Sequence, residues 1–299
     1  MRCLVSGVAG FIGSSIAERL LKEGHSVVGL DCFLPYYAKD IKERNLKSLE
    51  GFSSFSFVES NLLECDLNVL CEGMEWIFHE AAQAGVRASW GAEFVTYTSN
   101  NILATQRLLE AVRGSSSLKK IIYASSSSVY GNAESYPTKE TTLPRPISPY
   151  GVSKLAAEHL MRLYASEFGV PTASLRYFTV FGPRQRPDMA FNRFISAALK
   201  GNEIVVYGDG EQMRDFTFID DVVDANLLAA ERGQPGSVMN IGGGTNATVL
   251  EVLDIISSLI GPLKIKKIER QAGDAKRTSA DTRLARQEIG FTPKVGLEE

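Results

Sequence analysis

Tyr150 and Lys154 lie four residues apart in the segment SPYGVSK, and together they could take a proton from a hydroxyl group. That spacing places both side chains on one face of a helix. A free tyrosine has a pKa of about 10 and is a poor base at neutral pH, but a nearby ammonium group favours the phenolate. We therefore expect the pKa of Tyr150 to be lowered, which would make it a general base.

A hydroxyl-rich segment, ASSSSVYG, lies upstream of this pair. A strand is expected to end near Ser125, which would place the following hydroxyls at the C-terminal edge of a sheet. Open α/β sheets bind ligands at that edge. A YxxxK pair alone is common by chance and would then be a surface pair. The catalytic interpretation therefore depends on these hydroxyls and on a glycine motif near the N-terminus.

The glycine motif GVAGFIG places Gly7, Gly10 and Gly13 between an apolar strand-like run and an amphipathic helix. Glycines there let the backbone approach a pyrophosphate, which the free N–H groups of the helix N-terminus bind. Asp31 follows 18 residues beyond Gly13, where a carboxylate accepts hydrogen bonds from an adenosine ribose and repels a 2′-phosphate. Residues 32–34 contain no arginine, so the sequence predicts NAD rather than NADP. With a strand before it and a helix after it, the motif is more than a helix-opening turn.

The segment RQRPDMA indicates an anion site, because Arg184 and Arg186 lie two residues apart with prolines beside them. Gly-Pro and Arg-Pro dipeptides are typical of loops, and arginine forks bind carboxylates and phosphates. The alternative is that both arginines only attach the loop to acidic neighbours, a role that suits Arg184 better.

Alternating strands and helices must position these groups. Helical patterns cover residues 11–24, 92–113 and 149–168. Strands are predicted at residues 2–7, 26–31, 54–60, 76–82, 119–126, 172–178 and 237–243. This alternation predicts an α/β fold with a Rossmann-type, doubly wound parallel sheet.

The regular alternation weakens after about residue 177, where loops lengthen and Pro and Gly become denser. We expect an NAD-binding domain over residues 1–176 and a smaller C-terminal substrate-binding lobe over residues 177–299. The strand predicted at 237–243 should rejoin the first sheet, so a return to the first domain is expected near residues 222–245.

Composition limits the possible functions of this chain of 299 residues. A hydrophobic content of 44%, a charged content of 22% and a net charge of -3 indicate a globular protein without a nucleic-acid surface. No apolar run reaches the roughly 20 residues of a membrane helix, and a strand-like run at the N-terminus leaves no room for a signal peptide. Four cysteines without CxxC spacing and three scattered histidines predict reduced thiols, a cytoplasmic protein and no metal.

In this order, the glycine motif, the hydroxyl-rich strand end and the YxxxK pair resemble the extended short-chain dehydrogenase/reductase family over essentially the whole chain. The resemblance implies tightly bound NAD, a nucleotide-sugar substrate, and a homodimer formed through helices 92–113 and 149–168. It implies a catalytic hydroxyl at Ser126, the base at Tyr150 and its tuning partner at Lys154. The cofactor residues are then Gly7, Gly10, Phe11, Ile12, Gly13, Asp31, Asn61, Leu62, Ala81, Ala82, Asn101, Tyr150, Lys154 and Tyr177.

Two positions depart from the family pattern. Asn61 stands in place of an aspartate on the adenine side, and its side-chain oxygen can still accept a hydrogen bond from an amino group. The family's HLAA motif is HEAA here, so Glu80 stands at a position that is apolar in the family. We assign Glu80 no catalytic role.

Three features narrow the choice within the family. Ser127 and Ser128 stand where sugar-nucleotide dehydratases and UDP-glucuronate decarboxylases carry acidic residues. Thr179 replaces the usual asparagine of RYFNVYGP, and the RPDMA run beside AGVR resembles UDP-glucuronate 4-epimerases. We expect Ser127, Ser128, Thr179 and Arg186 to hold the carboxylate of a uronic acid, because a buried carboxylate needs several strong donors.

The nucleotide half of the substrate is assigned from the same resemblance. Arg214 matches the family's diphosphate arginine, and Arg87 is a second candidate for that task. Tyr207 is expected to stack on uracil, and Asp274 to bind the ribose.

These assignments predict an NAD-dependent 4-epimerase that converts UDP-glucuronate to UDP-galacturonate through a 4-keto sugar. The alternatives are a UDP-glucose/UDP-galactose 4-epimerase, which needs no carboxylate site, and a nucleotide-sugar dehydratase or decarboxylase. A non-catalytic NAD-binding protein is a further alternative, and the presence of Ser126, Tyr150 and Lys154 together argues against it.

Overall fold

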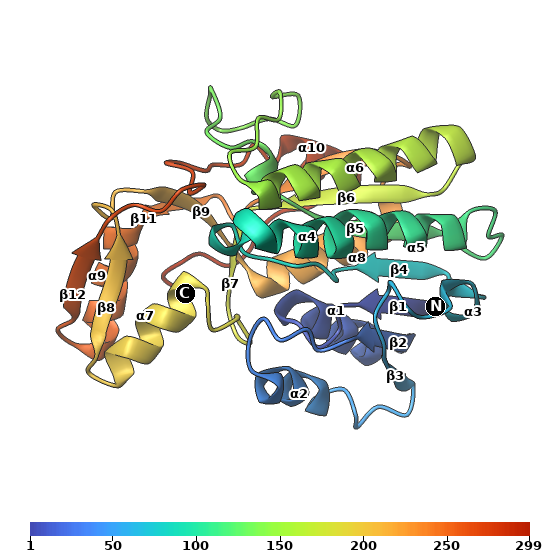
Figure 1. Ribbon diagram of the computed structural model, residues 1–299, viewed down its shortest axis with the longest axis horizontal. Helices are drawn as coiled ribbons and strands as arrows, with labels where there is room; N and C mark the ends of the chain where they lie inside the picture. The colour runs from blue at the N-terminus through green and yellow to red at the C-terminus, as the bar shows by residue number, and fades with distance from the viewer.

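A seven-stranded sheet forms the centre of the protein, as a computed structural model of residues 1–299 shows (Figure 1). Its strands are β1 (Arg2–Ser6), β2 (Ser26–Asp31), β3 (Phe55–Glu59), β4 (Trp76–His79), β5 (Lys120–Ser126), β6 (Thr172–Tyr177) and β10 (Ser237–Ile241). They run in the order β10-β6-β5-β4-β1-β2-β3, and every neighbouring pair is parallel. The order reverses between β1 and β4, so a ligand crevice is expected beyond the C-terminal ends of these strands.

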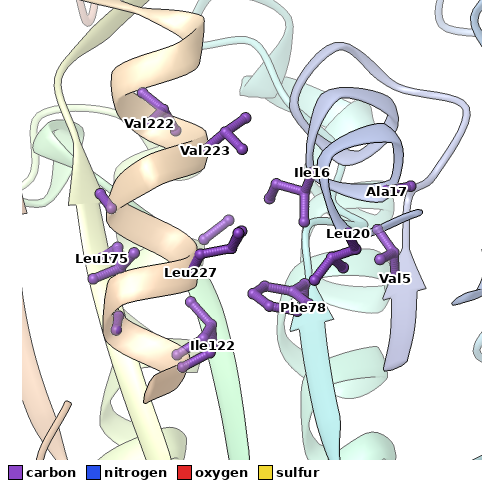
Figure 2. Packing of buried hydrophobic residues seen from close by; sticks show 14 of the residues in the cluster. Val5, Ile16, Ala17, Leu20, Phe78, Ile122, Leu175, Val222, Val223 and Leu227 are labelled. Atoms are coloured by element: carbon purple, nitrogen blue, oxygen red, sulfur yellow. The ribbon is translucent and has the colours of Figure 1, made fainter. Parts of the chain in front are cut away.

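Helices cover both faces of this sheet, which confirms the predicted doubly wound fold. One face carries α1 (Phe11–Lys22), α2 (Lys39–Lys47), α8 (Ile219–Arg232) and α10 (Arg283–Ile289). The other carries α3 (Leu67–Cys71), α5 (Ala104–Val112) and α6 (Pro149–Phe168). Figure 2 shows Ile16 and Leu20 of α1 and Val223 of α8 among the side chains packed on the first face. None of the helices combines the length and apolar character that crossing a membrane requires.

Local sequence signals explain the bounds of α6, the helix that carries the YxxxK pair. Ser148 precedes the helix, and its Oγ accepts a hydrogen bond from the N–H of Gly151 at 3.1 Å. Pro149 occupies the first turn, where its missing N–H leaves no donor unpaired. Gly169 ends the helix with a left-handed φ of 68°. These signals hold the start of the helix, and therefore the pair, at the C-terminal edge of the sheet.

The helix predicted over residues 92–113 is a path of several short segments. They are η2 (Gly91–Glu93), α4 (Phe94–Tyr97), the π-helical η3 (Thr98–Leu103) and α5. A π-helical turn widens the helix and changes which side chains face the sheet. The predicted long helix is present, and the π-helical turn within it is the feature that apolar spacing cannot reveal.

A smaller lobe stands beyond the C-terminal edge of the main sheet (Figure 1). It contains the three-stranded sheet of β7 (Thr179–Phe181), β9 (Met213–Phe218) and β11 (Thr245–Thr248). It also contains paired β8 (Glu203–Tyr207) and β12 (Lys264–Ile268), with α7 (Ala190–Leu199) and α9 (Val249–Ile260). Phe194, Ile204, Phe216 and Leu253 belong to its separate core.

The two parts of the protein share the second half of the chain. Strand β10 pairs with β6, and α8 and α10 pack on the main sheet. The buried Asp215 joins the two parts, because its carboxylate accepts hydrogen bonds from the N–H groups of Gly243, Gly244 and Ala280 at 2.8–3.1 Å. The chain therefore crosses between the two parts several times after residue 177.

Candidate active site

A single large cavity of about 920 Å³ lies between the C-terminal edge of the main sheet and the smaller lobe. All of the predicted site residues except Asn101 line it. They are Gly7, Gly10, Phe11, Ile12, Gly13, Asp31, Asn61, Leu62, Ala81, Ala82, Arg87, Ser126, Ser127, Ser128, Tyr150, Lys154, Tyr177, Thr179, Arg186, Tyr207, Arg214 and Asp274. Residues from both ends of the chain thus form one cavity, whose size is at the upper end of ligand sites.

The glycine motif forms a backbone cradle at one end of this cavity. A Cβ atom at Gly13 would lie 2.3 Å from the carbonyl oxygen of Gly7, so no side chain fits there. Gly7 itself has a φ of 73°, and a Cβ there would lie 2.7 Å from the N of Ala81. Helix α1 begins beside the cradle without a side-chain cap, which leaves its first N–H groups free for an anion. The cradle fits the pyrophosphate of a dinucleotide.

Asp31 ends β2 beside this cradle, in the position expected for ribose recognition. Its carboxylate accepts hydrogen bonds from the N–H groups of Ala9 at 3.1 Å and Phe33 at 2.9 Å. Burial raises the pKa of Asp31, and the hydrogen bond from Phe33 and the charge of Lys42 act against that rise. Sequence analysis missed Lys42, which lines the cavity and donates to the carbonyl of Leu34 at 2.7 Å. Residues 32–34 contain no cation, and Lys42 supplies one near Asp31 from a position further along the chain.

Asn101 does not reach the cavity, contrary to its predicted place among the cofactor residues. Its side chain is buried, accepts from the N–H of Gln83 at 2.7 Å, and donates to the carbonyl of Gln83 and to Ser153. The π-helical turn places the neighbouring Asn100 at the lining instead. Asn101 therefore positions the segment after β4 and connects it to α6.

Tyr150 and Lys154 of α6 meet Ser126 beside the C-terminal end of β5, where all three line the cavity. Burial raises the pKa of Tyr150 in the protein alone, while a hydrogen bond with Ser126 and the charge of Arg186 act to lower it. The side chains alone therefore do not lower the pKa of Tyr150, and a lowering by Lys154 together with a bound, positively charged nicotinamide stays a prediction. Lys154 donates to the carbonyl of Ala124 at 2.7 Å, and burial lowers its pKa to about 8. With that pKa Lys154 is still mostly protonated at pH 7, but the groups that act on the pKa of Tyr150 are Ser126, Arg186 and Glu80.

The predicted carboxylate grip comes from two separate segments. Ser127 and Ser128 begin a short 3-10 turn, η4 (Ser127–Val129), directly after β5, and Thr179 begins β7. Arg186 lies on the RQRPDMA loop and forms a two-point ion pair with Asp188, with both N–O distances at 3.0 Å. All four predicted residues line the same cavity.

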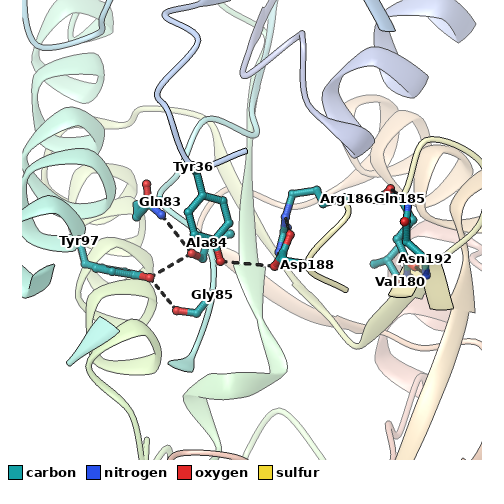
Figure 3. A network of polar contacts seen from close by, with 10 residues as sticks. All are labelled: Tyr36, Gln83, Ala84, Gly85, Tyr97, Val180, Gln185, Arg186, Asp188 and Asn192. Atoms are coloured by element: carbon teal, nitrogen blue, oxygen red, sulfur yellow. Dashed lines mark hydrogen bonds and ion pairs between the residues drawn. The ribbon is translucent and has the colours of Figure 1, made fainter. Parts of the chain in front are cut away.

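Figure 3 shows how the Arg186–Asp188 pair is held. The hydroxyl of Tyr36 donates to Asp188 at 3.3 Å, and Gln185 donates to the carbonyl of Val180 at 3.0 Å. Asp188 stands within the RPDMA motif, so a sequence signal for it existed although no role was assigned. Arg184 instead forms an ion pair with Glu18 of α1 and does not line the cavity, in agreement with the structural role considered for it.

The predicted nucleotide residues come from both parts of the protein: Arg87 follows β4 of the main sheet on η1 (Arg87–Ser89), and Tyr207, Arg214 and Asp274 belong to the smaller lobe. Arg87 pairs with Asp274 at 2.8 Å, and its guanidinium lies 3.9 Å from the ring centroid of Tyr207. Arg214 has no carboxylate partner, and burial together with the charges of Arg87 and Arg270 lowers its pKa. A half-buried arginine without an ion-pair partner of its own is suited to bind a strongly charged anion.

Arg193 was missed in the sequence. It lies on α7, lines the cavity and places its guanidinium 5.3 Å from the centroid of Tyr207. A lone arginine on a helix carries no spacing signal, so only the fold reveals it. With Arg87, it brings a second cation to the ring that is expected to meet the uracil.

Comparison with known proteins places this site in a family. The model of the NAD dependent epimerase/dehydratase family matches residues 3–242. An uncharacterized UDP-glucose epimerase of Bacillus subtilis is 44% identical over 304 residues, covering 100% of this chain and 95% of the relative. A UDP-glucuronate 4-epimerase of Thermodesulfobacterium geofontis is 35% identical over 305 residues, covering 99% and 92%.

A solved structure agrees with the fold and the cavity. UDP-glucuronic acid 4-epimerase from Bacillus cereus, in complex with UDP-glucuronic acid and NAD, superposes with a TM-score of 0.97 at 42% identity. The match covers 100% of this chain and 96% of that structure. The protein belongs to the NAD dependent epimerase/dehydratase family, as the resemblance in the sequence indicated.

Proposed function

We propose that the protein is an NAD-dependent 4-epimerase that interconverts UDP-glucuronate and UDP-galacturonate. One observation carries the choice of sugar: Arg186, Ser127, Ser128 and Thr179 line the cavity that also holds Tyr150. The charge of Arg186 is close enough to favour the ionised form of Tyr150. A carboxylate on the carbon next to the reacting carbon would therefore lie within reach of these donors.

The side chains at this end are suited to move one proton. Tyr150, assisted by Ser126, takes the proton of the sugar 4-hydroxyl, and Lys154 and Arg186 supply positive charge around the phenolate. Bound NAD⁺ supplies the hydride acceptor at the sugar C4 and a further positive charge beside Tyr150. In the reverse half of the reaction, after the sugar has turned, Tyr150 returns the proton to the 4-oxygen.

Inversion requires the sugar to turn while its nucleotide stays bound. Arg214 and Arg87 are placed to hold the diphosphate, and Tyr207 and Asp274 to hold uridine. Three of these groups, Arg214, Tyr207 and Asp274, lie on the smaller lobe, apart from the proton-transfer residues of the main sheet. Rotation about the diphosphate linkage would therefore present the other face of the 4-keto sugar to Tyr150 without dissociation.

The carboxylate grip has a second task. The 4-keto sugar derived from a uronic acid is a β-keto acid, which loses CO2 when the breaking bond stands perpendicular to the carbonyl plane. Asp188 occupies two N–H groups of Arg186, and an arginine has five. The remaining N–H groups, with the hydroxyls of Ser127 and Ser128, could hold the carboxylate near the carbonyl plane and slow decarboxylation.

A UDP-glucose/UDP-galactose 4-epimerase is the second candidate. The printed name of the Bacillus subtilis relative favours it. That reaction needs the same Tyr150 and Lys154 but no carboxylate grip, so RPDMA would then be structural. A dehydratase or decarboxylase is disfavoured because serines stand at 127 and 128 in place of an acid. We also propose a cytoplasmic homodimer formed through α6 and the segments around α5, as the family resemblance implies.

The first experiment separates the two epimerase candidates. The purified protein is incubated without added cofactor, separately with UDP-glucuronate and with UDP-glucose, and the products are identified by NMR. UDP-galacturonate from UDP-glucuronate alone would support the proposal together with retained NAD. UDP-galactose from UDP-glucose, with UDP-glucuronate unchanged, would contradict it.

The second experiment tests the grip itself. Arg186→Ala should raise the ratio of UDP-4-keto-pentose to UDP-galacturonate, because a freely rotating carboxylate reaches the geometry for CO2 loss. Arg184→Ala is the matched control, since Arg184 lies on the same loop but contacts Glu18 outside the cavity. An unchanged ratio in Arg186→Ala would show that the grip does not control decarboxylation.

A further inference from the structure

Glu80 is the charged residue that neither the sequence nor the proposed mechanism explains. It follows β4 in the segment HEAA, where the family resemblance implies a leucine. Its side chain lines the cavity on the same side as Tyr177 and close to the charge of Lys154. A carboxyl group there requires polar partners, since unpaired burial of a charge is strongly unfavourable.

Glu80 and its partners form a chain of three oxygen atoms that can hold either one or two protons. The hydroxyl of Tyr177 lies 2.9 Å from Oε1 of Glu80 and 2.9 Å from Oδ1 of Asn226. The orientation of the Asn226 amide is set, because its Nδ2 donates to the carbonyl of Val222 at 2.8 Å. Oδ1 of Asn226 can therefore only accept.

Two arrangements satisfy this chain, and they differ in the charge of Glu80. If Tyr177 donates to Asn226, Glu80 must be protonated and donate to Tyr177. If Glu80 is ionised, Tyr177 donates to Glu80, and Oδ1 of the buried Asn226 has no donor. The protonated form supplies a donor to Asn226, and the ionised form accepts the hydrogen bond of Tyr177. The geometry therefore allows Glu80 to bind or release one proton without a movement of the backbone.

The ionisable groups around Glu80 come from three elements. Lys154 and Tyr150 face it from α6, Tyr177 from β6 and Tyr123 from β5. Burial raises the pKa of Glu80 to about 7, while the hydrogen bond from Tyr177 and the charge of Lys154 act in the opposite direction. An added positive charge nearby would favour the ionised form.

The nicotinamide of NAD must lie at this end of the cavity, because hydride transfer and proton transfer act on the same C–O unit of the sugar. The glycine cradle fixes the pyrophosphate at the other end. We propose that Glu80 is a proton-exchanging charge partner of the nicotinamide, ionised when the ring is positive and protonated when it is neutral, so that the protein favours NAD⁺ over NADH. The proton released on ionisation passes to the solvent. This inference rests on NAD binding and not on the identity of the sugar.

The test measures protons and binding rather than turnover. Calorimetric titrations of the full-length, nucleotide-free chain with NAD⁺, in two buffers of different ionisation enthalpy, count the protons released. At pH 7 a carboxyl with a pKa of about 7 should release about half a proton per NAD⁺ bound, and NADH should release none. Glu80→Gln should abolish the release and lower the NAD⁺-to-NADH affinity ratio by about tenfold.

Matched variants keep this test decisive. Asp220→Asn removes a carboxylate from the exposed surface of α8 and should change neither the proton count nor the ratio. Tyr177→Phe removes the shared hydroxyl and should alter the proton count while NAD⁺ still binds. Equal proton release in the wild type and Glu80→Gln would overturn the proposal. An absence of proton release near pH 7 in the wild type would also overturn it, and this result does not depend on the folding of any variant. Neither result would bear on which sugar is epimerised.

Discussion

The two ends of the cavity recognise phosphates in different ways. The cofactor end uses backbone: Gly7 and Gly13 pack so closely that no Cβ fits, and the N-terminus of α1 supplies N–H groups. The proposed nucleotide end would use long side chains, such as Arg87 on η1 (Arg87–Ser89) and Arg214 on β9. A backbone site demands a fixed spacing in one short segment, whereas a side-chain site is assembled from distant ones. The first is therefore rigid and intolerant of change, and the second should lose affinity gradually.

The strongest test of this difference is Gly13→Ala. A Cβ at Gly13 would meet the carbonyl oxygen of Gly7 at 2.3 Å, so the cradle must deform. Because a displacement of about 1 Å can reduce function on the order of 100-fold, NAD binding should weaken by at least that factor. The measurement is the NAD content of the purified protein, with Gly51→Ala as control, since no atom lies within 4 Å of a Cβ there. Retention of a full complement of NAD would contradict the rigid cradle.

The next largest effect is expected for Tyr150→Phe. Removing a general base should reduce turnover by about 10²–10⁴-fold while NAD stays bound. Tyr164→Phe is the control on the same helix, because the Tyr164 hydroxyl accepts from Gln106 at 3.2 Å on the side away from the cavity. Rates are measured by NMR under saturating substrate. A loss no larger than in the control would remove Tyr150 from the reaction.

Arg214→Ala tests the side-chain end, and its effect should be smaller than that of Gly13→Ala. Hydrogen bonds to charged groups contribute about 1.5–3 kcal/mol, so the affinity for UDP should fall about 10–100-fold. The NAD content should not change, which separates the two ends. Titration calorimetry with UDP gives the affinity, and Arg162→Ala on the exposed side of α6 is the control. Loss of both ligands would mean that the two ends are not independent.

The smallest effect concerns the scaffold beneath the cofactor end. His79 donates through Nε2 to Thr105, whose own hydroxyl proton goes to the carbonyl of Asn101, and Nδ1 accepts from Ser6. Burial lowers the pKa of His79 from 6.5 to about 3. The unfolded chain therefore binds a proton below pH 6.5 that the folded chain refuses until about pH 3, so stability is lost as the pH falls through that window.

The expected loss is about 1.4 kcal/mol of unfolding free energy per pH unit below that point. Urea unfolding at pH 7.5 and 5.5 measures it. His79→Gln, which cannot titrate, should show a pH difference smaller by about that amount. An identical difference in both proteins would mean that the pKa of His79 is the same in the folded and unfolded states.

The same contrast explains what could be predicted from the sequence. The glycine cradle, Asp31 and the YxxxK pair were predictable because each follows from fixed spacing next to an apolar run. Strand β2 and helix α6 have the bounds that their patterns predict, 26–31 and 149–168. The family and the fold class are confirmed by the comparisons.

The features that the sequence does not reveal depend on side chains from distant segments. Burial of Tyr150 by the whole fold raises its pKa in the protein alone, and no local pattern encodes that burial. Whether Asn100 or Asn101 lines the cavity depends on a π-helical turn that changes the direction of the side chains there. Arg193 and Lys42 reach the cavity from single positions in helices, so their roles depend on tertiary packing alone. The position of Glu80 was visible as a departure, but its partner Asn226 lies 146 residues further along the chain.

The repeated crossing of the chain between its two parts has a kinetic consequence. The polypeptide passes between them near residues 178, 218, 243 and 280, and the buried Asp215 bonds to two of these passages. Domain opening usually requires a hinge of only a few residues, and here four passages would have to bend together. A reactive intermediate formed in the cavity between the two parts would therefore escape slowly. The connectivity of the chain can thus favour conversion of the intermediate to product over its release.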